Sequence, residues 1–223
     1  MRKLLGGWVV ACAILPAAVH SDEPSHFEGK VVVEWLDDDP FQPTMRLVQD
    51  FSFHQAAGKV WQVPGGEVLK GKGMPPLFRD RIGAPFESTF RKSAVVYDYA
   101  TQSMKEPWRE AQTMFYEAAI AEGVMPAEAK AMYLVLQAQG SRWEVPGSRC
   151  YGSCHGKTEK LIWRPMADDA RLVDLLNWVR ANDPSLEDVE RHSRAAILDP
   201  GPHVFPQDRC RVFSGSTLVK VLC

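Results

Sequence analysis

Two consecutive amphipathic helices, predicted within residues 107–140, constrain the fold of this chain more than any other feature. Apolar residues recur there at helical spacing, first as Trp108, Ala111, Phe115 and Ala118 and then as Ala129, Met132, Tyr133 and Leu136. Pro107 and Pro126 suit first helical turns, and Gly123 and Gly140 suit helix ends. Because the link between the helices is short, we expect an antiparallel pair whose aromatic and methionine side chains form core.

The segments before these helices are typical of β-structure. Residues 31–35, 44–54 and 60–63 are rich in β-branched and aromatic residues and are separated by turn-forming residues. They predict an antiparallel meander of three strands, preceded by a polar, frayed stretch at residues 22–30. The apolar run at residues 94–97 is too short for its periodicity to distinguish a strand from a buried helix.

Two further helices and a hairpin are predicted in the last third of the chain. The third helix has a face of four apolar residues, Leu172, Leu175, Leu176 and Val179. Asp168 lies at its positive start, and Asp183 with Pro184 suits the N-cap and first position of a fourth helix. Residues 210–213 and 217–222 flank a short turn and predict a closing hairpin.

The order of these elements predicts an α+β fold. A small antiparallel sheet would pack against the helical hairpin, and a disulfide-linked helical C-terminal appendage would follow. We place the α+β domain at residues 22–145 and the cysteine-bearing appendage, with its terminal hairpin, at residues 146–223. Residues 64–92 are rich in glycine and proline and are expected to be mostly loop.

The first 21 residues have the pattern of a secretory signal peptide. A basic start precedes an apolar run at residues 4–19, which is shorter than the roughly 20 residues that a membrane-spanning helix needs. Cleavage is expected after Ser21, and cleavage after Ala18 is the alternative. The mature protein is therefore expected in the periplasm or outside the cell.

A second interpretation of the leader concerns Cys12. Val9-Val10-Ala11-Cys12 resembles the lipobox of bacterial lipoproteins, in which the cysteine is lipidated and tethers the protein to a membrane. The apolar run before Cys12 is short and continues past it, which favours cleavage over lipidation. Membrane association is therefore expected only if Cys12 is lipidated.

Charge and cysteine content narrow the functional classes. The chain has a net charge of −2, and removing the leader, which carries two basic and no acidic residues, leaves −4. This acidic balance argues against non-specific nucleic-acid binding. Outside the leader the cysteines are Cys150, Cys154, Cys210 and Cys223. An even number in an oxidising compartment predicts two disulfides, but the sequence does not choose among the three possible pairings.

The sharpest local motif is Cys150-Tyr151-Gly152-Ser153-Cys154-His155-Gly156. Covalent haem attachment needs two thiols and an adjacent histidine, but its usual spacing has two residues between the cysteines, where this chain has three. A zinc site built from Cys150, Cys154, His155 and Cys210 is a second alternative, although an oxidising compartment disfavours thiolate ligands. Disulfides that staple an irregular loop are the favoured interpretation, so no cofactor is expected.

An ordered set of short motifs runs through residues 44–143. Val63-Pro64-Gly65-Gly66 is followed by Pro75, by Ala94-Val95-Val96-Tyr97-Asp98-Tyr99, and by Arg109-Glu110-Ala111-Gln112-Thr113-Met114-Phe115. This order resembles the bacterial and phage domain of unknown function 1353 family. The family pattern reads V-P-x-G-F-x-T-D-x-A-S-x-P-R, then A-V-x-H-D-x-x-Y, then R-x-x-A-D-x-x-F in a helix.

The chain departs from this pattern at most of its polar positions. The family's Thr-Asp is Leu69-Lys70 here, its Ser is Gly73, its Arg is Pro76, its His is Tyr97 beside a retained Asp98, and its helix Asp is Gln112. A His-Asp pair near a carboxylate could serve as a general base or hold a metal. We therefore expect the family fold to be kept as a scaffold, without the group that titrates near neutral pH.

These observations favour an exported envelope protein with a non-catalytic binding or structural role. Its partner, an envelope protein or a ligand, cannot be named from the sequence. An envelope hydrolase of unknown substrate is the enzyme alternative, and a redox protein built on Cys150, Cys154 and His155 is a third. Arg79, Asp80 and Arg81 are interpreted as a solvated charge cluster.

Overall fold

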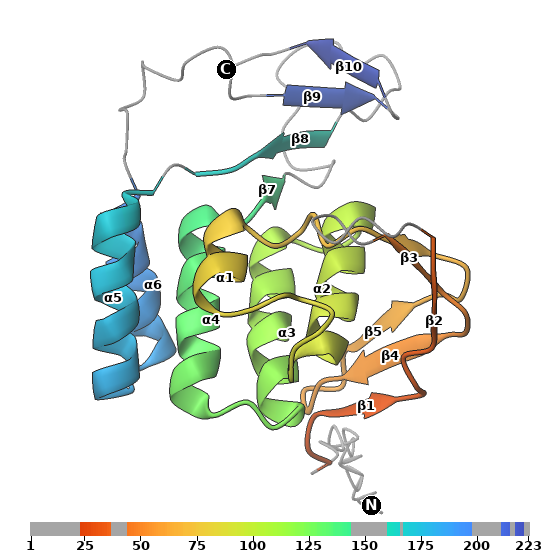
Figure 1. The fold of residues 1–223 in the computed structure, drawn as a ribbon, viewed down its shortest axis with the longest axis horizontal. Helices are drawn as coiled ribbons and strands as arrows, with labels where there is room; N and C mark the ends of the chain where they lie inside the picture. The colour runs from red at the N-terminus through yellow and green to blue at the C-terminus, as the bar shows by residue number, and fades with distance from the viewer. Residues whose placement is uncertain are drawn as a thin grey trace, which may run out of the picture.

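The structure of the protein is a computed structural model. This structure describes residues 23–36, 44–143, 160–165, 167–197, 211–214 and 217–220. The fold is α+β, as the element order predicted, with a row of helices that has small antiparallel sheets on one side and at one end (Figure 1). Within the described part of the chain, no helix is long and apolar enough to cross a membrane.

The predicted helical hairpin forms the centre of the molecule. It consists of α3 (Trp108–Ala121) and α4 (Pro126–Gln139), which pack against each other. α2 (Arg91–Ser103) packs on the other side of α3 and resolves the ambiguity at residues 94–97 in favour of a buried helix. One continuous hydrophobic core joins these helices to the sheets and to the helices after residue 167.

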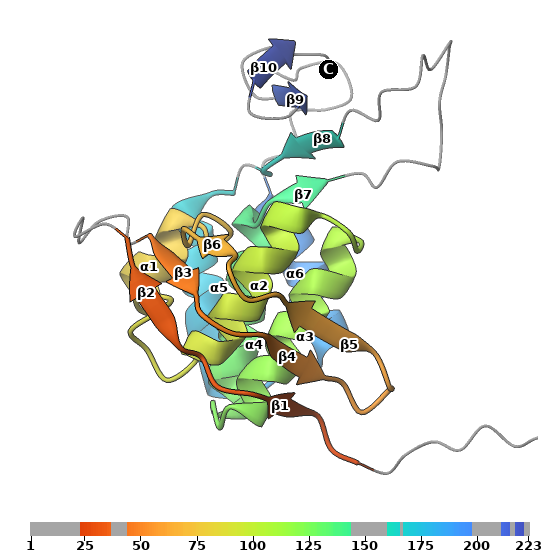
Figure 2. The same cartoon turned by 90° about the vertical axis from the view of Figure 1, so that its right-hand side faces the viewer.

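The N-terminal strands form two three-stranded sheets, so the prediction of a single meander is wrong. One sheet has the order β1 (His26–Glu28), β4 (Phe51–His54) and β5 (Val60–Val63), and the other has the order β2 (Val33–Trp35), β3 (Met45–Leu47) and β6 (Val68–Leu69). The predicted strand at residues 44–54 is divided at Asp50, whose carboxylate accepts a hydrogen bond from the backbone of Gly65 at 2.7 Å. Figure 2 shows both sheets on the side of α2 and α3.

The stretch predicted to be frayed contains β1. The ring of Phe27, on this edge strand, packs against two rings of the neighbouring strand β4, with centroids 5.5 Å from Phe51 and 5.0 Å from Phe53. Phe27 is partly buried against the hydrophobic core, which favours an ordered strand despite the polar residues around it. The loop-rich segment also contains more structure than predicted, namely β6 and the short α1 (Pro76–Arg81).

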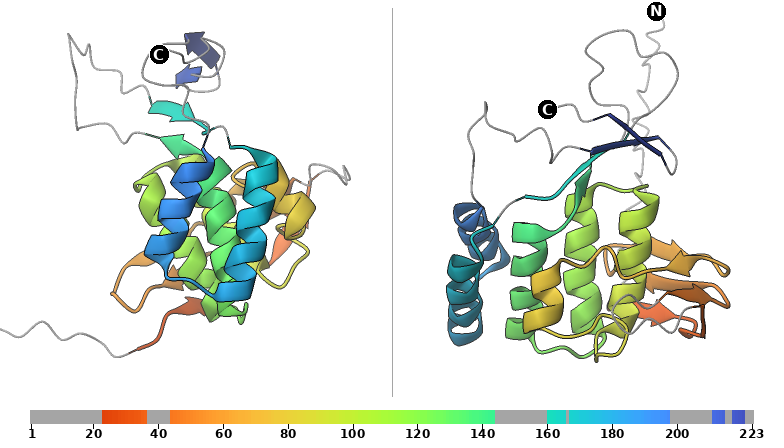
Figure 3. Two further views of the ribbon diagram at one scale, coloured as in Figure 1. Left: turned by 90° about the vertical axis from the view of Figure 1, so that its left-hand side faces the viewer. Right: turned by 45° about the horizontal axis from the view of Figure 1, so that its top comes forward.

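The two C-terminal helices pack on the face of α4 that is turned away from α3 (Figure 3). α5 (Asp169–Asn182) begins as predicted, because the Asp168 side chain accepts a hydrogen bond from the backbone of Arg171. α6 (Leu186–Ala196) begins later than predicted. Asp183 ends α5 in the left-handed region, with φ of 44°, and Ser185 is the N-cap of α6.

A third sheet closes the described chain. Its order is β10 (Thr217–Lys220), β9 (Arg211–Ser214), β8 (Lys160–Trp163) and β7 (Arg142–Trp143), all antiparallel. β9 and β10 confirm the predicted closing hairpin. β7 follows α4 directly, so this sheet joins the helical layer through the chain itself (Figure 1).

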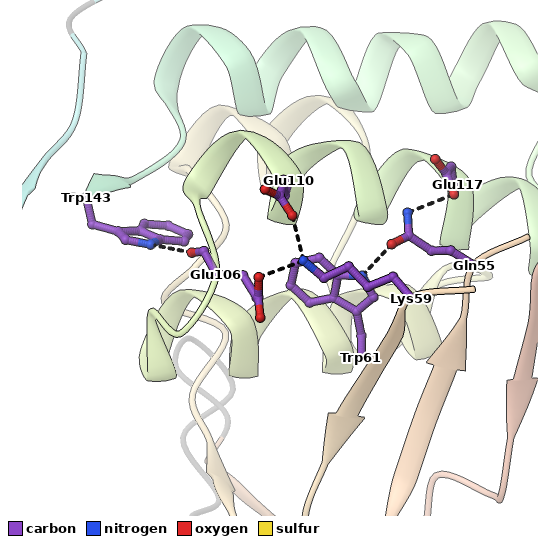
Figure 4. Close-up of polar contacts among 7 residues, drawn as sticks. All are labelled: Gln55, Lys59, Trp61, Glu106, Glu110, Glu117 and Trp143. Atoms are coloured by element: carbon purple, nitrogen blue, oxygen red, sulfur yellow. Dashed lines mark hydrogen bonds and ion pairs between the residues drawn. The ribbon is translucent and has the colours of Figure 1, made fainter. Parts of the chain in front are cut away.

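A polar network connects the β4–β5 hairpin to the start of α3 (Figure 4). Lys59 Nζ lies 2.6 Å from a carboxylate oxygen of Glu106 and 2.6 Å from one of Glu110, and 4.5 Å from the centre of the Trp61 ring. Trp61 Nε1 donates to Gln55 Oε1 at 2.7 Å. Burial lowers the pKa of Lys59, but its bonds to the two carboxylates outweigh burial and raise that pKa above its ordinary value.

Candidate functional site

Asp98, the acid that this chain retains from the family motif, lies on α2 and is completely buried. Its Oδ2 accepts hydrogen bonds from the backbone N–H of Lys70 at 2.9 Å and of Gly71 at 3.1 Å, and from Gln102 Nε2 at 2.7 Å. Its Oδ1 accepts from the backbone N–H of Gly73 at 3.0 Å. A carboxylate has about four acceptor positions, two on each oxygen, so Oδ2 is fully occupied and Oδ1 accepts one bond. Asp98 therefore acts as a clamp that holds loop 70–73 on α2.

Gly73 makes this clamp possible by its lack of a side chain. A Cβ at Gly73 would lie 2.5 Å from Thr101 Oγ1, which is too close for any real side chain. Thr101 Oγ1 in turn donates to the backbone carbonyl of Asp98 at 2.8 Å. The serine that the family pattern has at this position would not fit here without a shift of the loop or of Thr101.

Tyr97, in place of the family's histidine, is a core residue. Its ring is fully buried and meets the edge of Phe115 with centroids 5.4 Å apart. Within the described residues its hydroxyl has no hydrogen-bond partner of good geometry. Burial raises the pKa of this hydroxyl far above its usual range, and the neighbouring Gln112 amide opposes the shift only in part. Tyr97 thus stays neutral and cannot act as a base near pH 7.

Gln112, in place of the family's helix aspartate, links α3 to α4. It is fully buried, and its Nε2 donates to the backbone carbonyl of Leu136 at 2.9 Å. Gly140 permits this contact, because a Cβ there would lie 2.7 Å from Gln112 Nε2. Aspartate has no N–H to donate, so the glutamine amide provides a bond to this helix end that the family residue could not make.

The six motif positions therefore come together in space, but in two separate roles. Lys70, Gly73 and Asp98 form the loop clamp, whereas Tyr97 and Gln112 lie in the core behind it. The sixth, Pro76, begins α1. No group of three metal-ligating side chains occurs among the residues that the structure describes.

The predictions about the cysteines remain predictions. Cys12, Cys150, Cys154, His155, Cys210 and Cys223 all lie outside the described residues. The disulfide, haem and zinc interpretations of these residues are therefore neither supported nor contradicted by the fold. The same holds for the leader at residues 1–21.

A groove of about 460 Å³ opens beside the clamped loop. The charged residues that line it are Lys70, Lys72, Arg79, Asp80 and Arg164. The guanidinium group of Arg164 donates to Ser141 Oγ at 3.0 Å and to the backbone carbonyl of Lys72 at 2.5 Å. Arg164 is an exposed residue, and partial burial of its charged group lowers its pKa.

Only part of this groove could be expected from the sequence. Arg79 and Asp80 were interpreted as a solvated cluster, and they do reach solvent as exposed residues. Arg164 could not be connected with them, because it is 92 positions from Lys72 in the chain. The excess of basic residues within 70–81 was the one available signal.

Comparison with known proteins places the clamp in a family. A family model described as "Protein of unknown function (DUF1353)" matches residues 45–136. The uncharacterized protein y4jT of Sinorhizobium fredii is 31% identical over 142 residues, covering 64% of this chain and 42% of that protein. The uncharacterized protein y4iH of the same organism is 30% identical over 162 residues, covering 69% of this chain and 66% of that protein. No solved structure matches the chain.

Proposed function

Residues 45–136 form a domain of the DUF1353 family, and from this premise we propose that the protein is an exported envelope protein with a non-catalytic binding role. The domain contains every motif position from Lys70 to Gln112, so the family site itself can be judged from its geometry. The leader pattern at residues 1–21 supports export.

The complete burial of Asp98 and its four hydrogen bonds carry the proposal against catalysis. A general base must come within about 2.6–3.2 Å of the proton that it removes, directly or through one water. Asp98 is 0% exposed and both of its oxygens are occupied by loop N–H groups and Gln102. Tyr97, also 0% exposed, replaces the only family residue there that would titrate near pH 7. The retained Asp98 and the substituted Tyr97 therefore serve the fold.

Turnover assays on the purified full-length protein test this proposal. We expect no hydrolysis of chromogenic ester, phosphoester, peptide or glycoside substrates by the wild type or by Tyr97→Phe, which keeps the ring in the core. Tyr97→His, which restores the family residue, reports whether the site can regain a base. Wild-type turnover that Tyr97→Phe abolishes, with the melting temperature unchanged, would contradict a non-catalytic role.

Cell fractionation and intact mass test export and the fate of the cysteines. Cleavage after Ser21 predicts a periplasmic chain that begins at Asp22, whereas lipidation predicts a membrane-bound chain that begins at Cys12. Each disulfide lowers the mass by two hydrogens. Attached haem would add its own mass and a Soret band, which would favour the redox alternative at Cys150, Cys154 and His155. A cytoplasmic protein with an intact leader would overturn export.

A further inference from the structure

We propose that the groove between loop 70–73, α1 and Arg164 binds the phosphate group of an anionic ligand. This inference rests on the proposed binding function and names the ligand chemistry for it. Lys70 and Lys72 come from the clamped loop, Arg79 from α1, and Arg164 from the segment after β8. Three separate parts of the chain therefore bring cations to one concavity.

Among the described residues, the groove lining carries more positive than negative charge. Asp80 is the one acidic residue in its lining. Among the described residues, no carboxylate lies within ion-pair distance of Lys70, Lys72 or Arg164. Other cations of the same molecule are paired, as Lys130 is with Asp183 at 2.7 Å. A concavity lined by one sign of charge attracts the opposite sign.

Arg164 is held in place before any ligand arrives. Its hydrogen bonds to Ser141 and to the carbonyl of Lys72 fix the orientation of the guanidinium plane. A guanidinium has five N–H donors, so donors remain for a ligand after these two contacts. A guanidinium held in this way is suited to bidentate recognition of phosphate oxygens.

The Asp98 clamp holds the other side of the groove. It binds the backbone of Lys70, Gly71 and Gly73, so the two lysines project from a loop whose main chain is fixed. A fixed loop lowers the entropy that is lost when a ligand binds. This arrangement gives the buried clamp a functional consequence, because it presents cations to the groove without touching the ligand.

The size and charge of the groove favour a phosphate compound. Its volume of about 460 Å³ falls within the usual range of small-molecule sites, which is roughly 300–1,000 Å³. Several cations around one site suit an anion with more than one negative charge better than a single carboxylate. The phosphate could belong to a soluble phosphomonoester, which has three terminal oxygens and up to two negative charges. It could also belong to a phosphodiester lipid headgroup, which has two terminal oxygens and one negative charge and so uses fewer of the cations.

Isothermal titration calorimetry on the full-length protein tests the proposal with three probes. These are inorganic phosphate, glycerol 3-phosphate, and phosphatidylglycerol vesicles compared with phosphatidylcholine vesicles. We expect Arg164→Gln to weaken binding about tenfold or more and Lys72→Gln to weaken it several-fold, because each removes a charge-assisted contact. Lys30→Gln, which removes an exposed charge outside the groove lining, should leave affinity unchanged.

The outcomes distinguish a soluble phosphate compound from a lipid headgroup, and they test the groove and the non-catalytic role separately. Binding of the soluble compounds assigns a small-molecule phosphate, and binding of phosphatidylglycerol vesicles alone assigns a lipid headgroup. The inference is overturned if none of the probes binds, or if Arg164→Gln and Lys72→Gln, shown to be folded by their thermal melts, bind as the wild type does. Turnover would overturn the non-catalytic role whatever the titration shows, and failed titration without turnover overturns the groove alone.

Discussion

Two polar clusters in this molecule use similar contacts in opposite surroundings. Asp98 is 0% exposed and receives four hydrogen bonds, three of them from backbone N–H groups. The Lys59 side chain is 32% exposed, and its partners Glu106 and Glu110 are 44% and 52% exposed. Water can replace the contacts of Lys59 but has no access to those of Asp98. Burial, more than the number of contacts, therefore determines how much a polar cluster contributes to stability.

Asp98→Asn should give the largest effect. The substituted amide keeps the shape but turns an N–H₂ group toward donors, leaving buried N–H groups of the loop without an acceptor. We expect a loss of about 3–5 kcal/mol in the free energy of unfolding, since hydrogen bonds to a charged group contribute about 1.5–3 kcal/mol each and do not add fully. Urea unfolding followed by circular dichroism measures it. A loss below about 1 kcal/mol would mean that the buried contacts of Asp98 contribute no more to stability than the exposed contacts of Lys59.

Gly73→Ala should give the second-largest loss in the free energy of unfolding, because the added methyl group crowds α2. The added Cβ would meet Thr101 Oγ1 at 2.5 Å, so the loop must shift away from α2. Overpacking of this kind costs about 1–3 kcal/mol. Thr101→Ala removes the obstructing hydroxyl, so the double variant should lose less stability than the sum of the single variants. Strict additivity of the two changes in a double-mutant cycle would show that the close approach has no energetic consequence.

Lys59→Met should have a smaller effect, because exposed ion pairs contribute about 0.2–1 kcal/mol. Its contribution should shrink further in high salt, whereas the effect of Asp98→Asn should not. The pKa of Lys59 is raised in the folded protein, so its contribution is present below the pKa of an unfolded lysine and is lost as pH rises through the folded value. Unfolding of the wild type and variant at neutral pH and above about pH 10.5 checks the sign. A difference that grows at high pH would contradict it.

The fold could be predicted from the sequence where the signal was local. Helical spacing from Trp108 to Leu136 identified α3 and α4, and the α+β class followed from the order of elements. The division of residues 44–54 between two sheets could not be predicted. The break falls at Asp50, whose carboxylate accepts a hydrogen bond from the backbone of Gly65, and a contact between two loop residues 15 positions apart leaves no periodic signal.

The site could be predicted only as a set of positions. The motif identified Asp98 and its replaced neighbours, and the structure does bring Lys70 and Gly73 to it. The role of Asp98 was not visible, because its partners are backbone N–H groups that every loop carries. Arg164 was missed for a related reason, since its contact with the loop involves a carbonyl oxygen of Lys72, which has no sequence signature.

Tyr97→Phe should give the smallest effect, and in the opposite direction. The Tyr97 hydroxyl is buried without a well-formed hydrogen bond among the described residues, so its removal should be neutral or stabilise the protein by about 0.5 kcal/mol. Burial raises the pKa of Tyr97, so the folded state resists its ionisation while the unfolded state ionises near pH 10. Tyr97 therefore costs stability as pH rises above that value. The advantage of Tyr97→Phe should increase in alkaline unfolding experiments, and a pH-independent difference would mean that the pKa of Tyr97 is the same in the folded and unfolded states.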